Sequence, residues 1–220
     1  MAEDAPASGR RLDPAIARRR VVAIAGHTGD RATALAHLHD DEPTVRATAL
    51  GALHRLGALD RDVLVAAFDD DSPVVLRRAC ELATTWGGAV DTPPDPVIAA
   101  AVAMLLDHPD DSIVETAAWA CGERPPARPE VVARLAAIGV DHSDSLCREA
   151  AVAALGALGD PAGLPTILAG TTDRATVRRR AILALAPFEG PEVDAALERA
   201  LTDRDWQVRQ AAEDLREPPA

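Results

Sequence analysis

The chain has 220 residues, a formal net charge of −12 at pH 7, and 48% hydrophobic but only 2% aromatic residues. This acidic balance argues against a general nucleic-acid binder, which normally carries a basic excess. A hydrophobic content made of Ala, Leu and Val favours closely packed helices over a β-sheet, whose strands prefer aromatic and β-branched residues.

The first predicted element is a helix over residues 13–25. Asp13 can cap this helix, and Pro14 suits its first turn. Residues 1–12 before it are small and polar, so we expect a disordered arm there. Residues 217–220 are expected to form a short C-terminal tail.

Six helix pairs are predicted to follow the leading helix. The first helices of the pairs are expected near residues 31–39, 61–68, 95–107, 129–139, 161–169 and 191–202. The second helices are expected near residues 43–56, 73–86, 112–123, 145–157, 175–187 and 205–216. Asp recurs just before the second helices, where its carboxylate can cap free N–H groups. Proline-rich stretches at 92–96 and 124–129 lengthen the spacing on both sides of the third pair, and we expect the curvature to change there.

The second helices share a repeated pattern, in which an aliphatic residue or Cys is followed four positions later by Ala. The copies begin at Val45, Val75, Val114, Cys147, Val177 and Val208, and their alanines are Ala49, Ala79, Ala118, Ala151, Ala181 and Ala212. The copies follow one another every 30–39 residues, and repeats of this length are typical of stacked helical architectures. Because a helix turns about 100° per residue, both columns should lie on the buried face.

The segments VRATALGAL from Val45, CREAAVAAL from Cys147, VRRRAILAL from Val177 and VRQAAEDL from Val208 resemble HEAT-like repeats, above all the short bacterial kind shared with phycobilisome lyases. The resemblance covers residues 13–216. It implies an all-α, right-handed α-solenoid of six helix pairs plus a leading helix.

The resemblance also implies a ladder of arginines. In such repeats the Arg that follows the aliphatic residue pairs with an Asp in a helix–helix turn. The matching residues here are Arg46, Arg148, Arg178 and Arg209. Leu76 and Glu115 stand at this position in the second and third copies, so we expect the ladder to be interrupted there.

Second helices line the concave surface of HEAT-like proteins, so the resemblance places a partner-binding face there. The candidate residues on that face are Arg77, Arg78, Thr116, Ala117, Ala120, Ala150, Ala153, Arg179 and Arg180. They predict a groove with a small-residue floor between Arg pairs, which suits an amphipathic or extended segment with acidic ends. The alternative is that these arginines pair with local carboxylates such as Glu81 and Glu149.

Catalytic motifs are absent from the sequence. It contains no glycine-rich phosphate loop, no nucleophile elbow, and no evident grouping of Cys with His and an orienting carboxylate. Deoxyhypusine hydroxylases of similar fold hold iron with repeated His-Glu pairs, and no His here precedes Glu. We therefore expect no metal and no cofactor. His108 and His142 occupy equivalent turns of neighbouring repeats and are the one His pair that repeat symmetry would bring close.

These observations predict a scaffold or adaptor that binds another protein, without intrinsic catalysis, as a monomer or weak oligomer. The three cysteines lack metal-ligand spacing and fit a reducing cytoplasm. We expect neither a nucleic-acid nor a membrane partner, because apolar spans are absent and the charge is acidic. The alternative is a lyase or chaperone-like binder of an anionic, tetrapyrrole-type small molecule on the concave face, because bilin lyases share this repeat family.

Overall fold

The computed structural model describes residues 13–88 and 92–216, which form thirteen α-helices and no β-strand. The all-α solenoid of helix pairs behind a leading helix, predicted from the sequence, is confirmed. The expected arm at 1–12 and tail at 217–220 lie outside the described residues. The chain divides into two compact units, Met1–Asp60 and Arg61–Ala220.

The first unit contains α1 (Pro14–Thr28), α2 (Arg31–Ala36) and α3 (Pro43–Arg55). The helix α1 begins where Asp13 accepts a hydrogen bond from the backbone N–H of Ala15 at 2.9 Å. It packs against α3, as the second helices of neighbouring pairs pack against each other. Among the described residues no helix covers its other side, and Ile16, Val21 and Ile24 are 50–55% exposed.

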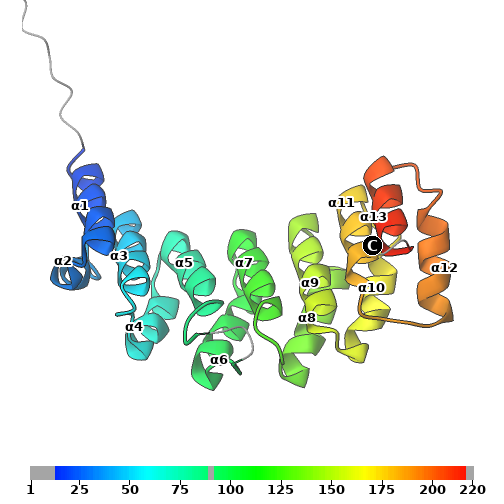
Figure 1. Ribbon diagram of the computed structural model, residues 1–220, viewed down its shortest axis with the longest axis horizontal. Coiled ribbons are helices and arrows are strands. Elements are labelled where there is room, and N and C mark those ends of the chain that lie inside the picture. The colour runs from blue at the N-terminus through cyan, green and yellow to red at the C-terminus, as the bar shows by residue number, and fades with distance from the viewer. Residues whose placement is uncertain (1–12, 89–91, 217–220) are drawn as a thin grey trace, which may run out of the picture. The chain divides into compact units, whose positions relative to one another are not determined.

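The second unit contains five helix pairs. Its first helices are α4 (Arg61–Ala66), α6 (Pro96–Met104), α8 (Pro129–Asp141), α10 (Leu164–Gly170) and α12 (Pro191–Ala200). Its second helices are α5 (Pro73–Ala83), α7 (Asp111–Gly122), α9 (Ser145–Leu158), α11 (Ala175–Ala184) and α13 (Trp206–Arg216). Within this unit, α5, α7, α9 and α11 stand side by side in one layer, and α4, α6 and α8 form the other layer (Figure 1).

The two repeat columns form the centre of the core, as predicted. Every aliphatic residue or Cys that begins a copy is at most 2% exposed, and all six alanines four positions later are 0% exposed. Ala at this column lets neighbouring helices approach closely, and the branched or aliphatic residue fills the space between the layers. The second helices within each unit can therefore stack directly on one another.

The two proline-rich stretches lie together in the second unit. One connects α5 to α6 and the other connects α7 to α8. The side chain of Asp95 accepts hydrogen bonds from the N–H groups of Val97 and Ile98 and so begins α6. The change of curvature expected at these stretches stays a prediction.

Candidate functional site

A groove of about 780 Å³ runs along the exposed side of the second helices in the second unit. Most of its lining comes from α7 and α9, with one residue each from α5 and α11. We call it the second-helix groove. It is lined by Glu81, Glu115, Thr116, Trp119, Gly122, Glu123, Leu146, Glu149, Ala150, Ala153, Ala154, Ala157 and Arg180.

The floor of the groove is made of small residues, because α7 and α9 approach each other closely. A β-carbon on Gly122 would lie only 2.8 Å from the Cα of Ala154, so only glycine fits at this point of contact. Thr116, Ala150 and Ala153, which the sequence analysis placed on the binding face, lie in this floor. Small side chains therefore form the floor of the groove, and larger side chains bound it.

Two large apolar side chains are exposed in the groove. Trp119 in α7 is 40% exposed and Leu146 in α9 is 52% exposed. Residues at the position of Trp119 in other copies, such as Val152 and Ile182, are buried between helices. The close contact at Gly122, one helical turn away, leaves no room for an indole between α7 and α9. The ring therefore lies at the surface, where it can contact a partner.

Sequence reasoning missed both residues. The signal for Trp119 was available, because a Trp is too large for a column otherwise occupied by residues such as Cys80 and Val152. No comparable signal marks Leu146, whose exposure depends on how α9 packs.

The charges of the lining are mainly acidic. Four glutamates, Glu81, Glu115, Glu123 and Glu149, face one arginine, Arg180. The Nη2 of Arg180 lies 3.5 Å from Glu149 Oε1. The groove thus has a formal charge of −3 from these five residues, which differs from the Arg-bounded groove expected from the sequence.

Local contacts explain the difference. Arg77 donates to the Oγ of Ser112 at 2.8 Å, and Arg78 pairs with Glu81 at 2.7 Å. Arg179 is exposed but does not line the groove. The alternative reading of the sequence, in which these arginines satisfy local groups, therefore describes Arg77, Arg78 and Arg180 well.

Ala117 and Ala120 do not face the groove, which corrects the sequence expectation. Ala117 is 0% exposed and Ala120 is 4% exposed. Ala120 instead lines a separate pocket beside the proline-rich stretches. The expectation assumed that every second helix presents the same face, whereas α7 is turned so that Trp119 points outward and these alanines point inward.

Arginine side chains connect successive helix–helix turns in the second unit. Arg148 donates from Nε and Nη2 to both carboxylate oxygens of Asp173, at 2.7 and 2.9 Å. Arg178 makes the same two bonds to Asp203, at 2.9 and 2.7 Å. These bonds lower the pKa of both carboxyl groups. Each arginine also donates from Nη1 to a carbonyl of its own turn, His142 and Asp173 respectively.

The two ends of this series differ in their partners. Arg46 donates to the carbonyls of Asp40 and Asp41, and Arg209 donates to the carbonyl of Asp203 at 2.7 Å. In the first unit, Arg18 of α1 makes the bidentate contact with Asp40, at 2.8 and 2.9 Å, and the sequence analysis did not identify it.

In the two repeat copies that lack the ladder Arg, the Asp that would accept its hydrogen bonds is also replaced. The copies with Leu76 and Glu115 in place of Arg are followed by turns in which His108 and His142 stand in place of Asp. The Nδ1 of each His accepts the backbone N–H two residues later, of Asp110 at 3.0 Å and of Asp144 at 3.2 Å. Each imidazole thus takes over the turn-closing role of the Asp without its charge.

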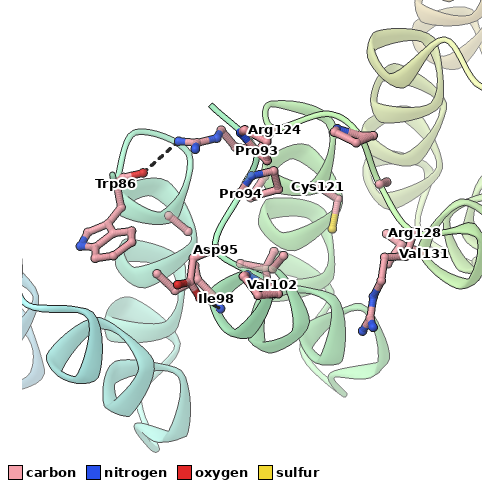
Figure 2. A pocket seen from close by; sticks show the side chains of 16 residues that line it. Trp86, Pro93, Pro94, Asp95, Ile98, Val102, Cys121, Arg124, Arg128 and Val131 are labelled. Atoms are coloured by element: carbon pink, nitrogen blue, oxygen red, sulfur yellow. Dashed lines mark hydrogen bonds between the residues drawn. The ribbon is translucent and has the colours of Figure 1, made fainter. Parts of the chain in front are cut away.

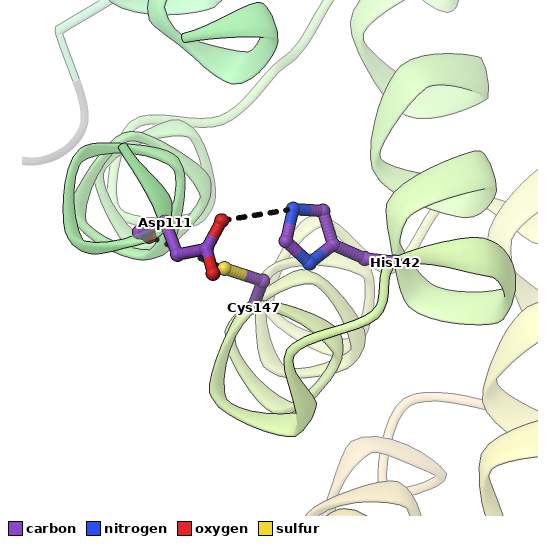
Figure 3. Close-up of side chains that lie close together, drawn as sticks. All are labelled: Asp111, His142 and Cys147. Carbon is purple, nitrogen blue, oxygen red and sulfur yellow. Dashed lines mark hydrogen bonds and ion pairs between the residues drawn. The ribbon is translucent and has the colours of Figure 1, made fainter. Parts of the chain in front are cut away.

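The turn at His142 brings three potential metal ligands together. Asp111 at the start of α7, His142 and Cys147 of α9 place their ligand atoms within 4.8 Å of one another (Figure 3). The sequence analysis found no such grouping, because Asp111 lies more than 30 residues before the other two. The His142 Nε2 is 3.9 Å from Asp111 Oδ1, and the Cys147 thiol donates to the Asp111 carbonyl oxygen at 3.2 Å.

The hydrogen bonds of this cluster oppose metal binding. A backbone N–H can only donate, so Nδ1 of His142 is an acceptor and the neutral ring carries its proton on Nε2. A metal-bound His needs the reverse, with the free nitrogen donating. Burial, together with the nearby carboxylates of Asp144 and Asp111, raises the pKa of Cys147 to about 12. A thiolate, which a metal or a nucleophilic mechanism requires, is therefore disfavoured.

Comparisons with known proteins agree with this architecture. Residues 98–186 match the family model described as HEAT repeats, and residues 177–203 match that of the PBS lyase HEAT-like repeat. No curated protein matches the chain significantly. None of the helices in the described ranges combines the length and apolar character needed to cross a membrane.

Solved structures of low sequence identity share the fold. The Escherichia coli protein YibA is 17% identical, with a TM-score of 0.64, and the match covers 92% of this chain and 74% of YibA. An engineered protein is 20% identical, with a TM-score of 0.60, over 84% of this chain and 96% of its own. A designed armadillo repeat protein in complex with the peptide (KR)4 is 16% identical, with a TM-score of 0.58, over 83% and 96%.

Proposed function

We propose that the chain, which matches HEAT-repeat family models over residues 98–203, acts as a protein-interaction module that holds a segment of a partner protein in the second-helix groove. The observation that carries this proposal is the pairing of exposed Trp119 and Leu146 with a floor of small residues. Aromatic side chains in a shaped groove are typical anchors of protein–protein contacts.

The lining charge defines the partner segment. Glu81, Glu115, Glu123 and Glu149 outnumber Arg180, so the groove favours a segment that carries Lys or Arg beside apolar residues. A cationic side chain over the exposed indole of Trp119 would add a cation–π contact. The sequence alone suggested a partner segment with acidic ends, whereas the acidic lining of the groove favours a basic segment.

The architecture is compatible with such a ligand. The designed armadillo repeat protein of similar fold is in complex with the basic peptide (KR)4. The tetrapyrrole-type alternative receives no support from this groove, because four carboxylates would face the propionates of an anionic ligand.

Calorimetric titration of the full chain with (KR)4 tests the proposal directly. We expect binding that weakens as salt is added, because exposed charges are screened beyond about 8 Å at physiological ionic strength. Replacing Trp119 with Ala should weaken binding at least about tenfold, equivalent to about 1.4 kcal/mol. A peptide of the same length made of alternating Glu and Ser should bind much more weakly.

Trp206 provides a matched control. It is 64% exposed but lies on α13, outside the groove. Trp206→Ala should leave the affinity for (KR)4 unchanged. Equal effects of the two Trp substitutions, or tighter binding of the acidic peptide, would contradict the proposal.

A further inference from the structure

A second pocket, distinct from the second-helix groove, lies where the two proline-rich stretches meet. Its volume is about 240 Å³, and we call it the proline pocket. The ends of α5 and α7 and the starts of α6 and α8 surround it (Figure 2). Its walls are mainly apolar, formed by residues such as Pro94, Ile98, Val102, Cys121 and Val131.

The buried cation of this pocket is Arg124, which is only 8% exposed. Its Nη1 donates to the carbonyls of Thr84 at 3.2 Å and Trp86 at 2.9 Å, and its Nη2 donates to the carbonyl of Thr92 at 3.1 Å. Its Nε has no acceptor among the described residues but is enclosed, so a ligand in the pocket would pair with the second N–H group of Nη2. The three acceptors are carbonyls, two of them at the C-terminal end of α5, and no carboxylate pairs with the guanidinium among residues 13–88 and 92–216.

Two arginines of the helix–helix turns show what Arg124 lacks. Arg148 and Arg178 also give Nη1 to backbone carbonyls, but their Nε and Nη2 hold a carboxylate at 2.7–2.9 Å. Arg124 keeps the carbonyl contacts and has no carboxylate partner among the described residues. A buried charge is ordinarily paired, because removing it from water is unfavourable.

The other charged residues of the pocket are already engaged. Asp95 caps α6 and accepts from Arg61 Nε at 2.9 Å. Arg128 lies 3.2 Å from Glu130, and both of these side chains are 65% exposed. Arg124 is therefore the buried cation of the pocket, whereas Arg128 is exposed to solvent and lies beside a carboxylate.

We propose that the proline pocket binds a small organic carboxylate, with its apolar body against Pro94, Ile98 and Val102 and its carboxylate paired with Arg124. An apolar cavity of about 150 Å³ is large enough to hold benzene. The proline pocket is larger and can hold a single ring with a carboxylate substituent. It is too small for a tetrapyrrole, so this site is separate from any ligand suggested by the repeat resemblance.

Titration of the full chain with benzoate and with benzamide, followed by calorimetry and by the indole N–H resonance of Trp86, tests the proposal. The two probes have the same shape, and only benzoate is charged. We expect benzoate to bind at least about tenfold more tightly than benzamide. Equal affinities, or no benzoate binding at millimolar concentration, would overturn the proposal.

Two variants locate the site. Arg124→Gln keeps side-chain amide donors but removes the charge, so it should abolish the preference for benzoate. Ala99→Phe should fill the pocket and abolish binding of both probes, whereas Ala133→Phe, at an exposed position of α8 outside the pocket, should leave binding unchanged. If Arg124→Gln does not fold, the preference of the wild-type chain for benzoate over benzamide still tests the role of the ligand's charge. Ala99→Phe still tests whether the ligand lies in the proline pocket. Unchanged benzoate affinity in Ala99→Phe would place the ligand elsewhere and refute the assignment.

Discussion

Gly156 of α9 lies so close to Ala184 of α11 that a β-carbon on Gly156 would stand 2.7 Å from the Ala184 Cα and 2.6 Å from its Cβ. This contact sets the distance between two second helices. Gly156→Ala should therefore destabilise the fold by about 1–3 kcal/mol through overpacking, although Ala is the better helix former by about 1 kcal/mol. Urea unfolding followed by circular dichroism measures the change.

Gly170→Ala is the control for this substitution. Its added β-carbon would meet the Cβ of Ala181 at 3.1 Å, a contact that a small shift can relieve. We expect a smaller loss of stability than at Gly156. A larger loss at Gly170 would mean that the close approach of α9 and α11 does not govern the packing.

The Ala column makes a second prediction about packing. Ala151 is 0% exposed in the middle of α9, between the two layers. Ala151→Leu should lower the free energy of unfolding by about 1–3 kcal/mol, because three extra carbons must enter a filled core. The same substitution at exposed Ala157 should change stability by less than about 0.5 kcal/mol. Similar losses at both positions would contradict the predicted burial of the column.

The sequence was sufficient to predict the helix pairs and the buried columns. Val and Ala recur at fixed positions, and burial of both columns follows from the helical period alone. It was also sufficient to predict where Arg148 and Arg178 would stand relative to the helix–helix turns. These features repeat, so each copy supports the interpretation of the others.

Features that belong to one repeat alone could not be predicted in this way. Gly122 meets Ala154 as closely as Gly156 meets Ala184, but α7 carries Trp119 where α9 carries the smaller Val152, which is buried. The helical period alone places Ala117 and Ala120 outward and Trp119 between helices. The grouping of Asp111 with Cys147 likewise depends on how neighbouring repeats stack. Repeat patterns therefore predict the scaffold better than the binding surface.

The pair formed by Arg18 and Asp40 predicts acid sensitivity. The hydrogen bonds from Arg18 lower the pKa of Asp40 from 3.8 to about 2. A carboxyl group whose pKa is lower in the folded state stabilises the fold above its unfolded pKa and loses this contribution as pH falls toward the folded value. Stability should therefore decline between about pH 4 and pH 2. Asp40→Asn should lower stability at pH 7 and make this decline shallower. Parallel pH profiles of the two proteins would exclude a role for this pair.

The cysteines should be unreactive in the folded chain. Burial raises the pKa of Cys80, Cys121 and Cys147 to about 12, so almost no thiolate exists at neutral pH. We expect iodoacetamide to modify none of them at pH 7.5 in native buffer and all three in urea, as measured by intact mass. Rapid native modification that Cys147→Ser removes would show that this thiol is activated beside His142.

Charge reversal within the groove distinguishes a basic partner segment from an acidic one. Arg180 is the only arginine among the lining residues, and its side chain lies over Glu149. Arg180→Glu should strengthen binding of (KR)4 by a few-fold, because an exposed charge contact contributes up to about 1 kcal/mol. Glu149→Gln should weaken it by a similar factor. Arg179→Glu is the matched control, since Arg179 is exposed on the same helix but does not line the groove. If Arg180→Glu instead weakens binding, and a Glu-rich peptide binds the wild type more tightly than (KR)4, the groove recognises an acidic segment despite its glutamates.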